Sequence, residues 1–430
     1  MDLTISEKII RDHCDQKDIS AGDFVLVNID KCLGNDITAP KAIEVFEKVI
    51  EGTERTVFDS SKIIITPDHF TPNKDIASAI QCKILKDFAN KYHIQHYFEV
   101  GRVGIEHCLI PEQGLVAPSE LIIGADSHTC TYGALGAFST GVGSTDLGVA
   151  MALGKCWLQV PETLRFIYSG QLNKWVSGKD LILYTIGKIG VDGATYKVME
   201  FTGEIINNFS MANRFTMCNM AIEAGAKTGF IFPDKITEQY MKSVGISKIK
   251  TYDDNNMKYH DSIEIDCSNI EPQIAFPHLP SNTKPISEVQ DLHIEIDQAV
   301  IGSCTNGRME DLRIAAKIMK NNKIHPNVRC IIIPGTPTIQ FHALKEGLIE
   351  IFLKAGAIVS PPTCGPCLGG HMGILAPGER AISTTNRNFM GRMGHTESEV
   401  YLSNPVIAAS SALKGFIASP ERFIKVKYKR

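Results

Sequence analysis

Three of the twelve cysteines in the chain occupy positions where thiolates could bind a metal. Cys304 lies two residues after an apolar run, residues 299–302, that is typical of a buried strand, and the Gly and Asn around it favour a turn. Cys364 and Cys367 follow a second such run, residues 357–359, sixty positions further along. Because ligand sites collect where the carboxyl ends of parallel strands meet, we expect the two loops to present the three thiolates to one point.

The second cysteine pair allows three interpretations. Cys364-Gly365-Pro366-Cys367 matches the redox motif of thioredoxin-like proteins, but the Leu-Gly-Gly that follows is a poor start for a helix. A structural zinc site needs four Cys or His ligands, and His371 could be the fourth. An iron–sulfur cluster usually takes four cysteines, so three leave one iron open to act as a Lewis acid on a substrate. Spacing alone does not choose among these interpretations.

Composition limits the class of protein. The 430 residues are 43% hydrophobic and 21% charged, a balance typical of a soluble globular chain with two or three domains. A net charge of −4 argues against a nucleic-acid partner. Residues 1–8 suggest an amphipathic helix rather than a signal peptide, and no run approaches the roughly 18 apolar residues of a membrane span. We therefore expect a cytoplasmic protein without a membrane partner.

In a reducing compartment most cysteines are expected to be small buried hydrophobic residues rather than disulfides. This expectation covers the cysteines that stand alone among apolar neighbours, namely Cys14, Cys82, Cys156, Cys218 and Cys330.

Apolar runs alternate with helical patterns along much of the chain. Residues 23–27, 62–66 and 121–125 suggest buried strands, and residues 76–92 carry apolar side chains at helical spacing (Ile76, Ile80, Ile84, Leu85, Phe88). The strand–loop–helix rhythm resumes after residue 294. This alternation predicts an α/β fold with mainly parallel sheets covered by helices. The predicted division is into three α/β/α domains, residues 1–162, 163–285 and 286–430.

Five motifs, in order along the chain, resemble those of the aconitase superfamily, and the match runs from about residue 23 to about residue 419. They are Gly124-Ala125-Asp126-Ser127-His128-Thr129, Cys218-Asn219-Met220-Ala221-Ile222-Glu223-Ala224-Gly225-Ala226, Ser303-Cys304-Thr305-Asn306, Cys364-Gly365-Pro366-Cys367 and Asn386-Arg387-Asn388-Phe389-Met390-Gly391-Arg392. Each motif is weak alone, but the ordered set is specific.

The resemblance implies three α/β domains around a central iron–sulfur cleft. It also implies one 4Fe-4S cluster held by Cys304, Cys364 and Cys367, with one open iron. The family reaction removes water from a 2-hydroxy acid and returns it to the neighbouring carbon. That chemistry needs a Lewis acid and a proton for the departing hydroxyl, and cations for the negative charge that develops.

The resemblance also assigns roles to other residues. Pro67-Asp68-His69 resembles the family's Asp–His pair, in which His69 protonates the leaving hydroxyl. His107 is expected to pair with Asp126, and His128 with Glu223, orienting groups around the iron-bound water. Arg387 and Arg392 suit a carboxylate clamp. Asn386 and Asn219 resemble positions that contact cluster or substrate, Asn35-Asp36-Ile37-Thr38 is a weaker candidate for substrate contact, and His371 is expected beside the cluster rather than on it.

Three further segments resemble the large subunits of two-subunit members of the superfamily. They are Gly104-Ile105-Glu106-His107, Pro111-Glu112-Gln113-Gly114 and Leu375-Ala376-Pro377-Gly378-Glu379-Arg380. We therefore expect the family's swivelling domain on a separate small subunit, in a heterodimer or heterotetramer. That subunit would supply the family's Ser base and further Arg residues.

Two other classes of function compete with this one. An iron-responsive RNA-binding regulator is disfavoured by the acidic charge balance, and a non-catalytic zinc protein is the other alternative. No residue in the sequence distinguishes which hydroxy di- or tricarboxylic acid is the substrate.

Overall fold

The computed structural model describes residues 3–253 and 257–422. The chain divides into two compact units. The first comprises Met1–Gly170 and Asp192–Ile265, and the second comprises Gln171–Val191 and Asp266–Arg430. Each unit has its own apolar core.

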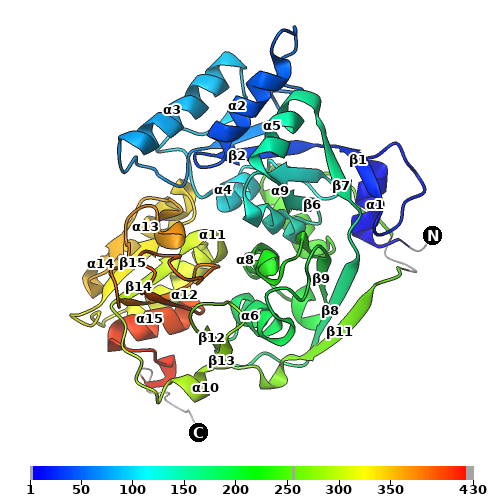
Figure 1. Ribbon diagram of the computed structural model, residues 1–430. Coiled ribbons are helices and arrows are strands. Elements are labelled where there is room, and N and C mark those ends of the chain that lie inside the picture. Colours follow the sequence, from blue (N-terminus) through cyan, green and yellow to red (C-terminus); the bar gives the residue numbers. More distant parts are fainter. Residues whose placement is uncertain (1–2, 254–256, 423–430) are drawn as a thin grey trace. The chain divides into compact units, whose positions relative to one another are not determined.

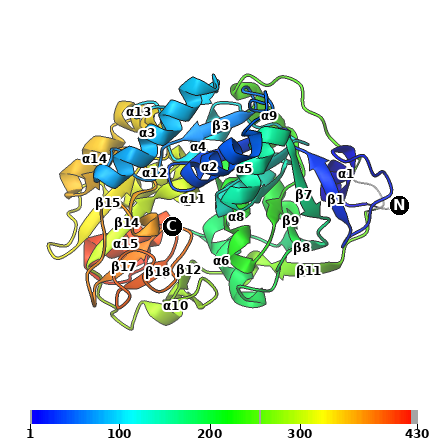
Figure 2. The same cartoon turned by 45° about the horizontal axis from the view of Figure 1, so that its top comes forward.

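The first unit is built on a five-stranded sheet with the strand order β4-β3-β2-β5-β6, in which every neighbouring pair is parallel. The strands are β2 (Lys31–Asn35), β3 (Ile63–Thr66), β4 (His96–Tyr97), β5 (Leu121–Gly124) and β6 (Phe138–Gly141). Helix α2 (Ala39–Ile50) lies between α3 (Ile76–Lys91) and α5 (Ser144–Leu153), and α2 and α5 pack on the sheet (Figures 1 and 2).

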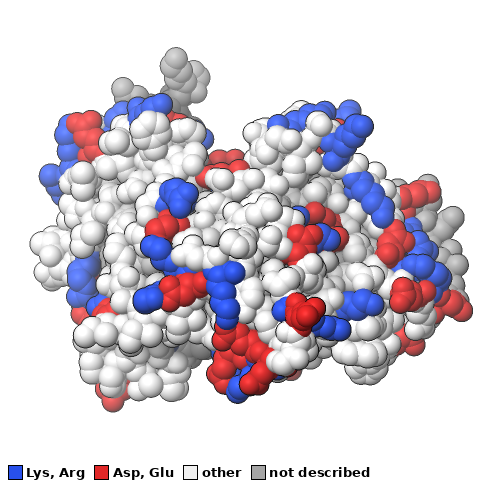
Figure 3. Space-filling model, turned by 90° about the horizontal axis from the view of Figure 1, so that it is seen from above, with Lys and Arg blue, Asp and Glu red and all other residues white. Residues whose placement is uncertain are grey.

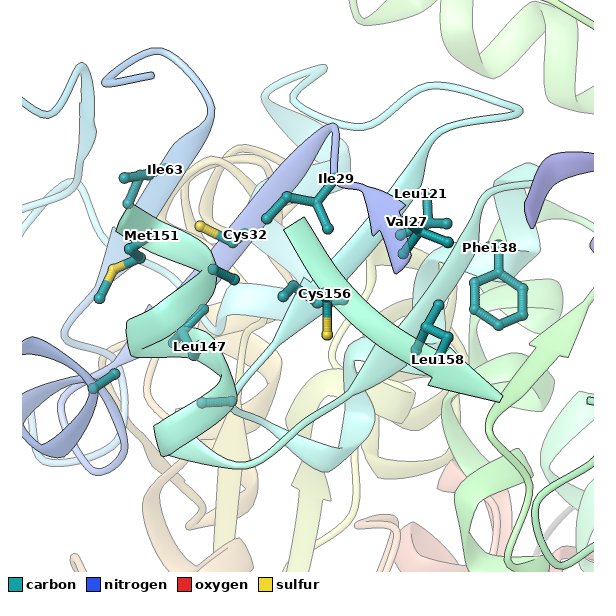
Figure 4. Packing of buried hydrophobic residues seen from close by; sticks show 14 of the residues in the cluster. Val27, Ile29, Cys32, Ile63, Leu121, Phe138, Leu147, Met151, Cys156 and Leu158 are labelled. Atoms are coloured by element: carbon teal, nitrogen blue, oxygen red, sulfur yellow. The ribbon is translucent and has the colours of Figure 1, made fainter. Parts of the chain in front are cut away.

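The core of the first unit explains why β3 and β5 are short, continuous apolar runs. All four residues of each strand are buried, as expected for strands covered on both faces. Leu147 and Met151 of α5 pack in the same core as Cys32 of β2 (Figure 4). Burial among apolar groups raises the pKa of Cys156, also in this core, to about 11, so its thiol stays protonated.

The prediction of buried, isolated cysteines is confirmed for four of the five. Cys14, Cys156, Cys218 and Cys330 are buried. Cys82 is only partly buried and contacts polar groups, because its sulfur accepts a hydrogen bond from Asn73 (3.0 Å).

The other strands of the first unit form a two-stranded ribbon and a four-stranded sheet of order β10-β9-β8-β11. The ribbon is β1 (Phe24–Asn28) and β7 (Lys155–Gln159); the sheet is β8 (Thr163–Ser169), β9 (Val198–Thr202), β10 (Thr228–Phe230) and β11 (Asp261–Asp266). The helices are α1 (Ile5–Asp12), α4 (Glu106–Glu112), α7 (Glu204–Asn207), α8 (Met211–Asn219) and α9 (Lys235–Ser243), with 3₁₀ segments η1 (Ser127–Leu135) and η2 (Met220–Ala224).

Three local predictions differ from the structure. Residues 23–27 were predicted to be a buried strand, but β1 forms a two-stranded ribbon with β7, so its side chains alternate and Phe24 is 70% exposed. In α3, Ile76 is 81% exposed because the buried face carries Leu85 and Phe88 instead. The N-terminal helix begins at Ile5, and the start of the predicted segment, residues 1–2, lies outside the described residues.

The second unit contains a seven-stranded sheet of order β13-β12-β18-β17-β14-β15-β16. The strands from β18 to β16 are parallel, whereas β12 pairs antiparallel with both β13 and β18. They are β12 (Gln273–Ala275), β13 (Thr283–Pro285), β14 (Gln298–Gly302), β15 (Arg329–Ile333), β16 (Ile358–Val359), β17 (Arg380–Ser383) and β18 (Glu399–Leu402).

Helices of the second unit cover this sheet. Helices α12 (Met309–Met319) and α15 (Pro405–Lys414) lie side by side against β14, and α14 (Leu348–Ala355) joins them in one core (Figure 1). The remaining segments are α6 (Gly178–Ile189), α10 (Ile286–Val289), α11 (Ser303–Asn306), α13 (Pro337–Lys345), η3 (Cys267–Asn269), η4 (Gly365–Leu368) and η5 (Pro420–Arg422).

The predicted α/β class with mainly parallel sheets is confirmed by these sheets. The division at residues 162 and 285 stays a prediction. Helix α6, which that division places in the middle domain, belongs to the second unit and packs on β12 and β13.

Two surface properties bear on possible partners. Among the residues that the structure describes, no helix has both the length and the apolar character needed to cross a membrane. On the face in Figure 3, basic and acidic side chains are interspersed and form no continuous basic area.

Candidate active site

The first unit gathers acidic and histidine side chains at the carboxyl ends of its three central strands. Asp36 follows β2, Asp68 and His69 follow β3, and Asp126 follows β5. In the order β4-β3-β2-β5-β6, the strands that follow β2 in the sequence, β3 and β4, lie on one side of it. The next strands, β5 and β6, lie on the other side, so the direction of strand addition reverses at β2. Loops diverge at such a reversal, which leaves a crevice where ligands of α/β sheets bind.

His69 is held by two buried carboxylates. Its Nδ1 lies 2.8 Å from Asp68 Oδ1, and its backbone N–H donates to Asp36 (2.9 Å). Burial disfavours the imidazolium, but the charge and hydrogen bond of Asp68, together with the charge of Asp36, prevail and raise the pKa of His69 well above its usual value. The raised pKa favours the protonated ring near neutral pH, and its Nε2 lies 4.0 Å from Asp126 Oδ2.

His107 has the opposite protonation state. Its Nε2 lies 2.8 Å from Asp126 Oδ1, and its Nδ1 lies 3.0 Å from the hydroxyl of Tyr132. Complete burial lowers the pKa of His107 despite the neighbouring carboxylate. A neutral ring can donate from Nε2 to Asp126 and accept from Tyr132, so these two partners determine the tautomer.

The second predicted pair is also present as a hydrogen bond. His128 Nε2 lies 2.8 Å from Glu223 Oε1, joining η1 to η2, and both residues are buried. The backbone N–H of His128 donates to Asp126 (2.7 Å), so the two pairs share one carboxylate. Hydrogen bonds from His107 and His128 outweigh burial and hold the pKa of Asp126 well below its usual range.

Glu106 was quoted within a motif but was not predicted as a site residue. It is the first residue of α4, and its backbone N–H donates to Asp68 Oδ2 (2.8 Å). Its Oε1 accepts from Asn35 Nδ2 (3.0 Å). Burial and the charges of Asp68 and Asp126 raise the pKa of Glu106 well above its usual value, so the carboxyl group is neutral. The sequence signal was an acidic residue next to His107 in an apolar segment.

The second unit gathers the predicted cysteines in the same topological position. Cys304 follows β14, and Asn386 follows β17. After β16, Cys364 directly precedes η4, and Cys367 lies within it. The turn before Cys304 requires Gly302, because φ is +140° there and a Cβ would lie 2.1 Å from the carbonyl oxygen of Ile333.

One amide side chain connects two of the three thiols. Asn386 Nδ2 donates to Cys304 Sγ (3.3 Å), and Cys367 Sγ donates to Asn386 Oδ1 (3.3 Å). All three predicted cysteine ligands are buried. Asn219 lies in the first unit, where its amide donates to the hydroxyl of Thr131 (2.8 Å).

The chemistry of the cysteine set fits an iron–sulfur cluster, because all three residues are buried thiols and cysteine sulfur is the usual ligand of such clusters. In the part of the chain that the structure describes, only two sets of three His, Cys, Asp or Glu bring their ligand atoms within 4.8 Å of one another, and both are in the first unit. Those sets are Asp36–Asp68–His69 and His69–Glu106–Asp126. Neither set contains a cysteine, so both differ in ligand chemistry from the thiols of the second unit.

The two predicted clamp residues lie in the loop between β17 and β18. Arg387 and Arg392 are both partly buried. Among the described residues, the Nε–H of Arg392 is buried without a hydrogen-bond partner, so it is a donor that an anionic ligand could satisfy. Asn388 anchors the loop, because its amide donates to the carbonyls of Phe276 (2.8 Å) and Val400 (3.2 Å).

Lys179 was missed by the sequence analysis. It lies in the first turn of α6 and is fully buried, and its ammonium donates to the carbonyls of Thr384 (2.8 Å) and Thr385 (2.5 Å). Burial lowers the pKa of Lys179 to about 7, against an opposing effect of Cys304 and Cys367. A Ser177–Asp180 capping box marked the helix start in the sequence, but nothing there marked the lysine as buried.

Comparison with known proteins gives the class of this chain. Residues 7–415 match the family described as the aconitase family (aconitate hydratase). The chain belongs to the aconitase family. Membership implies an iron–sulfur cluster, and the buried thiols of the second unit fit that cofactor.

Close relatives are named as one kind of subunit within the family. The chain is 64% identical to the 3-isopropylmalate dehydratase large subunit of Thermodesulfovibrio yellowstonii, over 98% of this chain and 99% of the relative. It is 62% identical to the large subunit of the same name from Halothermothrix orenii (99% and 100%) and 61% identical to large subunit 1 from Pyrococcus furiosus (98% and 99%).

A solved structure with the same fold is much more distant. The holo-form of Thermococcus kodakaraensis aconitase X aligns with a TM-score of 0.52 and 12% identity, covering 96% of this chain and 92% of that one. At this identity the likeness establishes the fold alone.

Proposed function

We propose that this chain is the cluster-bearing large subunit of a 3-isopropylmalate dehydratase. The enzyme isomerises 2-isopropylmalate to 3-isopropylmalate through isopropylmaleate, in leucine biosynthesis. The observation that carries this proposal is 64% identity across nearly the full length of both this chain and a relative of that name. It is a hydro-lyase reaction, which agrees with the family description.

The proposed cofactor is one 4Fe-4S cluster bound by Cys304, Cys364 and Cys367. Three thiolates leave one iron without a protein ligand, and that iron supplies Lewis-acid binding of the substrate hydroxyl and carboxylate. The hydrogen bond from the Asn386 amide N–H to Cys304 Sγ supports this assignment, because an N–H donor stabilises thiolate charge.

His69 is the proposed acid for the departing hydroxyl. A protonated ring with Nδ1 fixed by Asp68 keeps Nε2–H directed away from its partner, which suits proton donation to an oxygen. The His107–Asp126 and His128–Glu223 pairs are proposed to orient the water that leaves and returns, since each ring has a fixed hydrogen-bond partner.

Arg387 and Arg392 are proposed to bind substrate carboxylates. A guanidinium can donate two parallel N–H hydrogen bonds to a carboxylate. The buried Nε–H of Arg392 has no hydrogen-bond partner among the described residues, so it can be one of these donors. Asn386 and Asn219 are proposed to contact cluster or substrate.

A separate small subunit is the proposed partner. The relatives are named large subunits, and the matched motifs provide a cluster, an acid and a clamp but no base for the carbon-bound proton. We propose that the small subunit carries the swivelling domain, supplies the Ser base and excludes water, in a heterodimer or heterotetramer. Excluding water strengthens every electrostatic contact with the substrate.

The experiment that tests the function is co-expression with the small subunit and an anaerobic assay. Isopropylmalate, homocitrate, dimethylmalate and citrate are compared by the ultraviolet absorbance of the alkene product. We expect turnover of isopropylmalate in the complex and none by the large subunit alone. Preference for homocitrate or dimethylmalate would reassign the substrate within the family. Robust turnover by this chain alone would contradict the proposed partner.

A further inference from the structure

Lys179 is fully buried, and among the residues that the structure describes its ammonium makes no hydrogen bond to a carboxylate. Its ammonium donates to two backbone carbonyls, those of Thr384 and Thr385, which are neutral acceptors. The neighbouring acid, Asp180, is occupied elsewhere: it accepts from the backbone N–H of Gln273 (2.9 Å) and from the Asn404 amide. Burial disfavours the ammonium and lowers the pKa of Lys179 to about 7, so a nearby anion is what would keep this lysine fully protonated at neutral pH.

Hydrogen bonds connect Lys179, through the backbone, to the predicted cysteine ligands. The carbonyl of Thr384 accepts from Lys179 and also from the hydroxyl of Thr305 (2.6 Å), which is the residue after Cys304. The carbonyl of Thr385 precedes Asn386, whose amide contacts the sulfurs of both Cys304 and Cys367. Lys179 therefore fixes the two backbone groups that join the turn after β14 to the turn after β17.

We infer that Lys179 is a positioning residue for the iron–sulfur cluster: its charge compensates the thiolate-bound cluster, and its two hydrogen bonds fix the turn that carries Asn386. The inference rests on the cluster proposed above and names a new residue for it. The opposing effect of Cys304 and Cys367 on the pKa of Lys179 agrees with a mutual interaction. The assigned property is electrostatic, so it should change the reduction potential of the cluster as well as its retention.

The test uses the full chain with a reconstituted cluster and compares three substitutions. Lys179→Met removes both charge and donors, Lys179→Gln keeps a donor but removes the charge, and Lys179→Arg keeps the charge. The matched control is Lys188→Met, which removes one positive charge from the exposed side of the same helix. Circular dichroism and thermal unfolding establish which variants fold.

The readouts are the iron and sulfide content per chain and the midpoint potential in a redox titration followed by electron paramagnetic resonance. Removing a nearby positive charge disfavours the added electron, so we expect a more negative midpoint for the Met and Gln variants and a midpoint near that of the unaltered chain for the Arg variant. We expect the Met variant also to retain less iron after gel filtration. The Lys188→Met control should match the unaltered chain in both readouts.

A folded neutral variant with an unchanged midpoint and full iron content overturns the inference. If the Met variant does not fold, the Gln variant, which can still donate to the two carbonyls, carries the measurement. Equal shifts in Lys179→Met and Lys188→Met would also contradict the inference, since they would show only a change in net charge. If the unaltered chain assembles no iron–sulfur cluster at all, it is the proposed function that fails.

Discussion

The parallel sheets of the two units share one strand order but present different chemistry. Only the parallel strands of each sheet are compared, in their order along the chain. The strand that comes first is central, the next two lie on one side of it, and the last two lie on the other: β4-β3-β2-β5-β6 in the first unit and β16-β15-β14-β17-β18 in the second. In each, the functional residues follow the carboxyl ends of strands: β2, β3 and β5 in the first unit, and β14, β16 and β17 in the second. The topology fixes where a site forms, and residue type decides what the site does.

The two sites also differ in what holds them in place. The first unit's residues hold one another, because each histidine has a carboxylate within 2.8 Å, and Asp36, Asp68 and Asp126 also accept backbone N–H groups. The thiols of the second unit depend on backbone and neighbours instead: the Gly302 turn, the amide of Asn386 and the cation of Lys179. A histidine–carboxylate site can be complete in the chain by itself, whereas a thiolate site is completed by its metal.

The largest expected effect comes from the thiols. Replacing Cys304, Cys364 or Cys367 singly by Ser should abolish stable cluster assembly, because sulfur is the ligand that iron–sulfur clusters require. Cys330→Ser is the matched control, since Cys330 is buried on the neighbouring strand β15 and the raised pKa of its thiol, about 12, reflects burial alone. Iron and acid-labile sulfide per chain are the measurement. A control that loses as much iron as a ligand variant would contradict the assignment.

The second largest expected effect distinguishes the histidine–carboxylate site of the first unit from the thiol site of the second. His69→Asn should lower kcat of the complex by about 10²–10⁴-fold, the usual contribution of a general acid, while iron content stays unchanged. His13→Asn is the control, because His13 also bonds a carboxylate, Asp30, at 2.7 Å in the first unit. Loss of iron in His69→Asn would show that the two sites are not separable in this way.

The clamp should give a smaller effect. Arg387→Lys and Arg392→Lys keep the charge but lose the planar fork, so each should cost about 1.5–3 kcal/mol, or about ten- to a hundredfold in kcat/KM. Arg313→Lys serves as the control, because Arg313 makes a forked contact with Glu346 on the exposed surface. Unchanged kinetics in both clamp variants would remove these residues from the site.

Only some of the features that distinguish the two units could be predicted from the sequence. The cysteine positions after apolar runs gave the strand-end loops of the second unit, and family motifs gave the His–carboxylate partners of the first. Burial was harder to predict, because it depends on which elements pack on which: the apolar run of β1 forms a two-stranded ribbon with β7, and Ile76 of α3 faces solvent.

The missed residues share one physical reason. Glu106 and Lys179 have charged side chains in short segments, where the ordinary expectation is a solvated position. Both are fully buried because residues distant in sequence surround them: Asn35 and Asp68 for the carboxyl group, Thr384 and Thr385 for the ammonium. No local pattern contains that information.

The smallest expected effect tests the proton held by Glu106. The pKa of Glu106 is raised by burial and by Asp68 and Asp126, so the folded chain keeps a proton that the unfolded chain loses above the ordinary glutamate pKa of 4.5. Folding stability therefore falls as pH rises from 4.5 toward the folded pKa. Glu106→Gln mimics the neutral carboxyl group and removes this dependence, so the Tm of the variant relative to the unaltered chain should increase with pH above 4.5.

Glu44→Gln provides a control of opposite sign. Glu44 is exposed, and hydrogen bonds from Lys41 and Lys48 lower its pKa to about 2, so its stabilising effect exists above pH 4.5 and disappears as pH falls toward 2. The Tm of Glu44→Gln should be slightly lower than that of the unaltered chain at neutral pH, and the two should become equal in acid. Infrared difference spectra give a direct check, because the carbonyl stretch of a protonated carboxyl group should be absent from Glu106→Gln. A Tm difference for Glu106→Gln that follows the sign of Glu44→Gln would show that Glu106 is ionised, and the buried carboxylates of the first unit would then need another source of compensation.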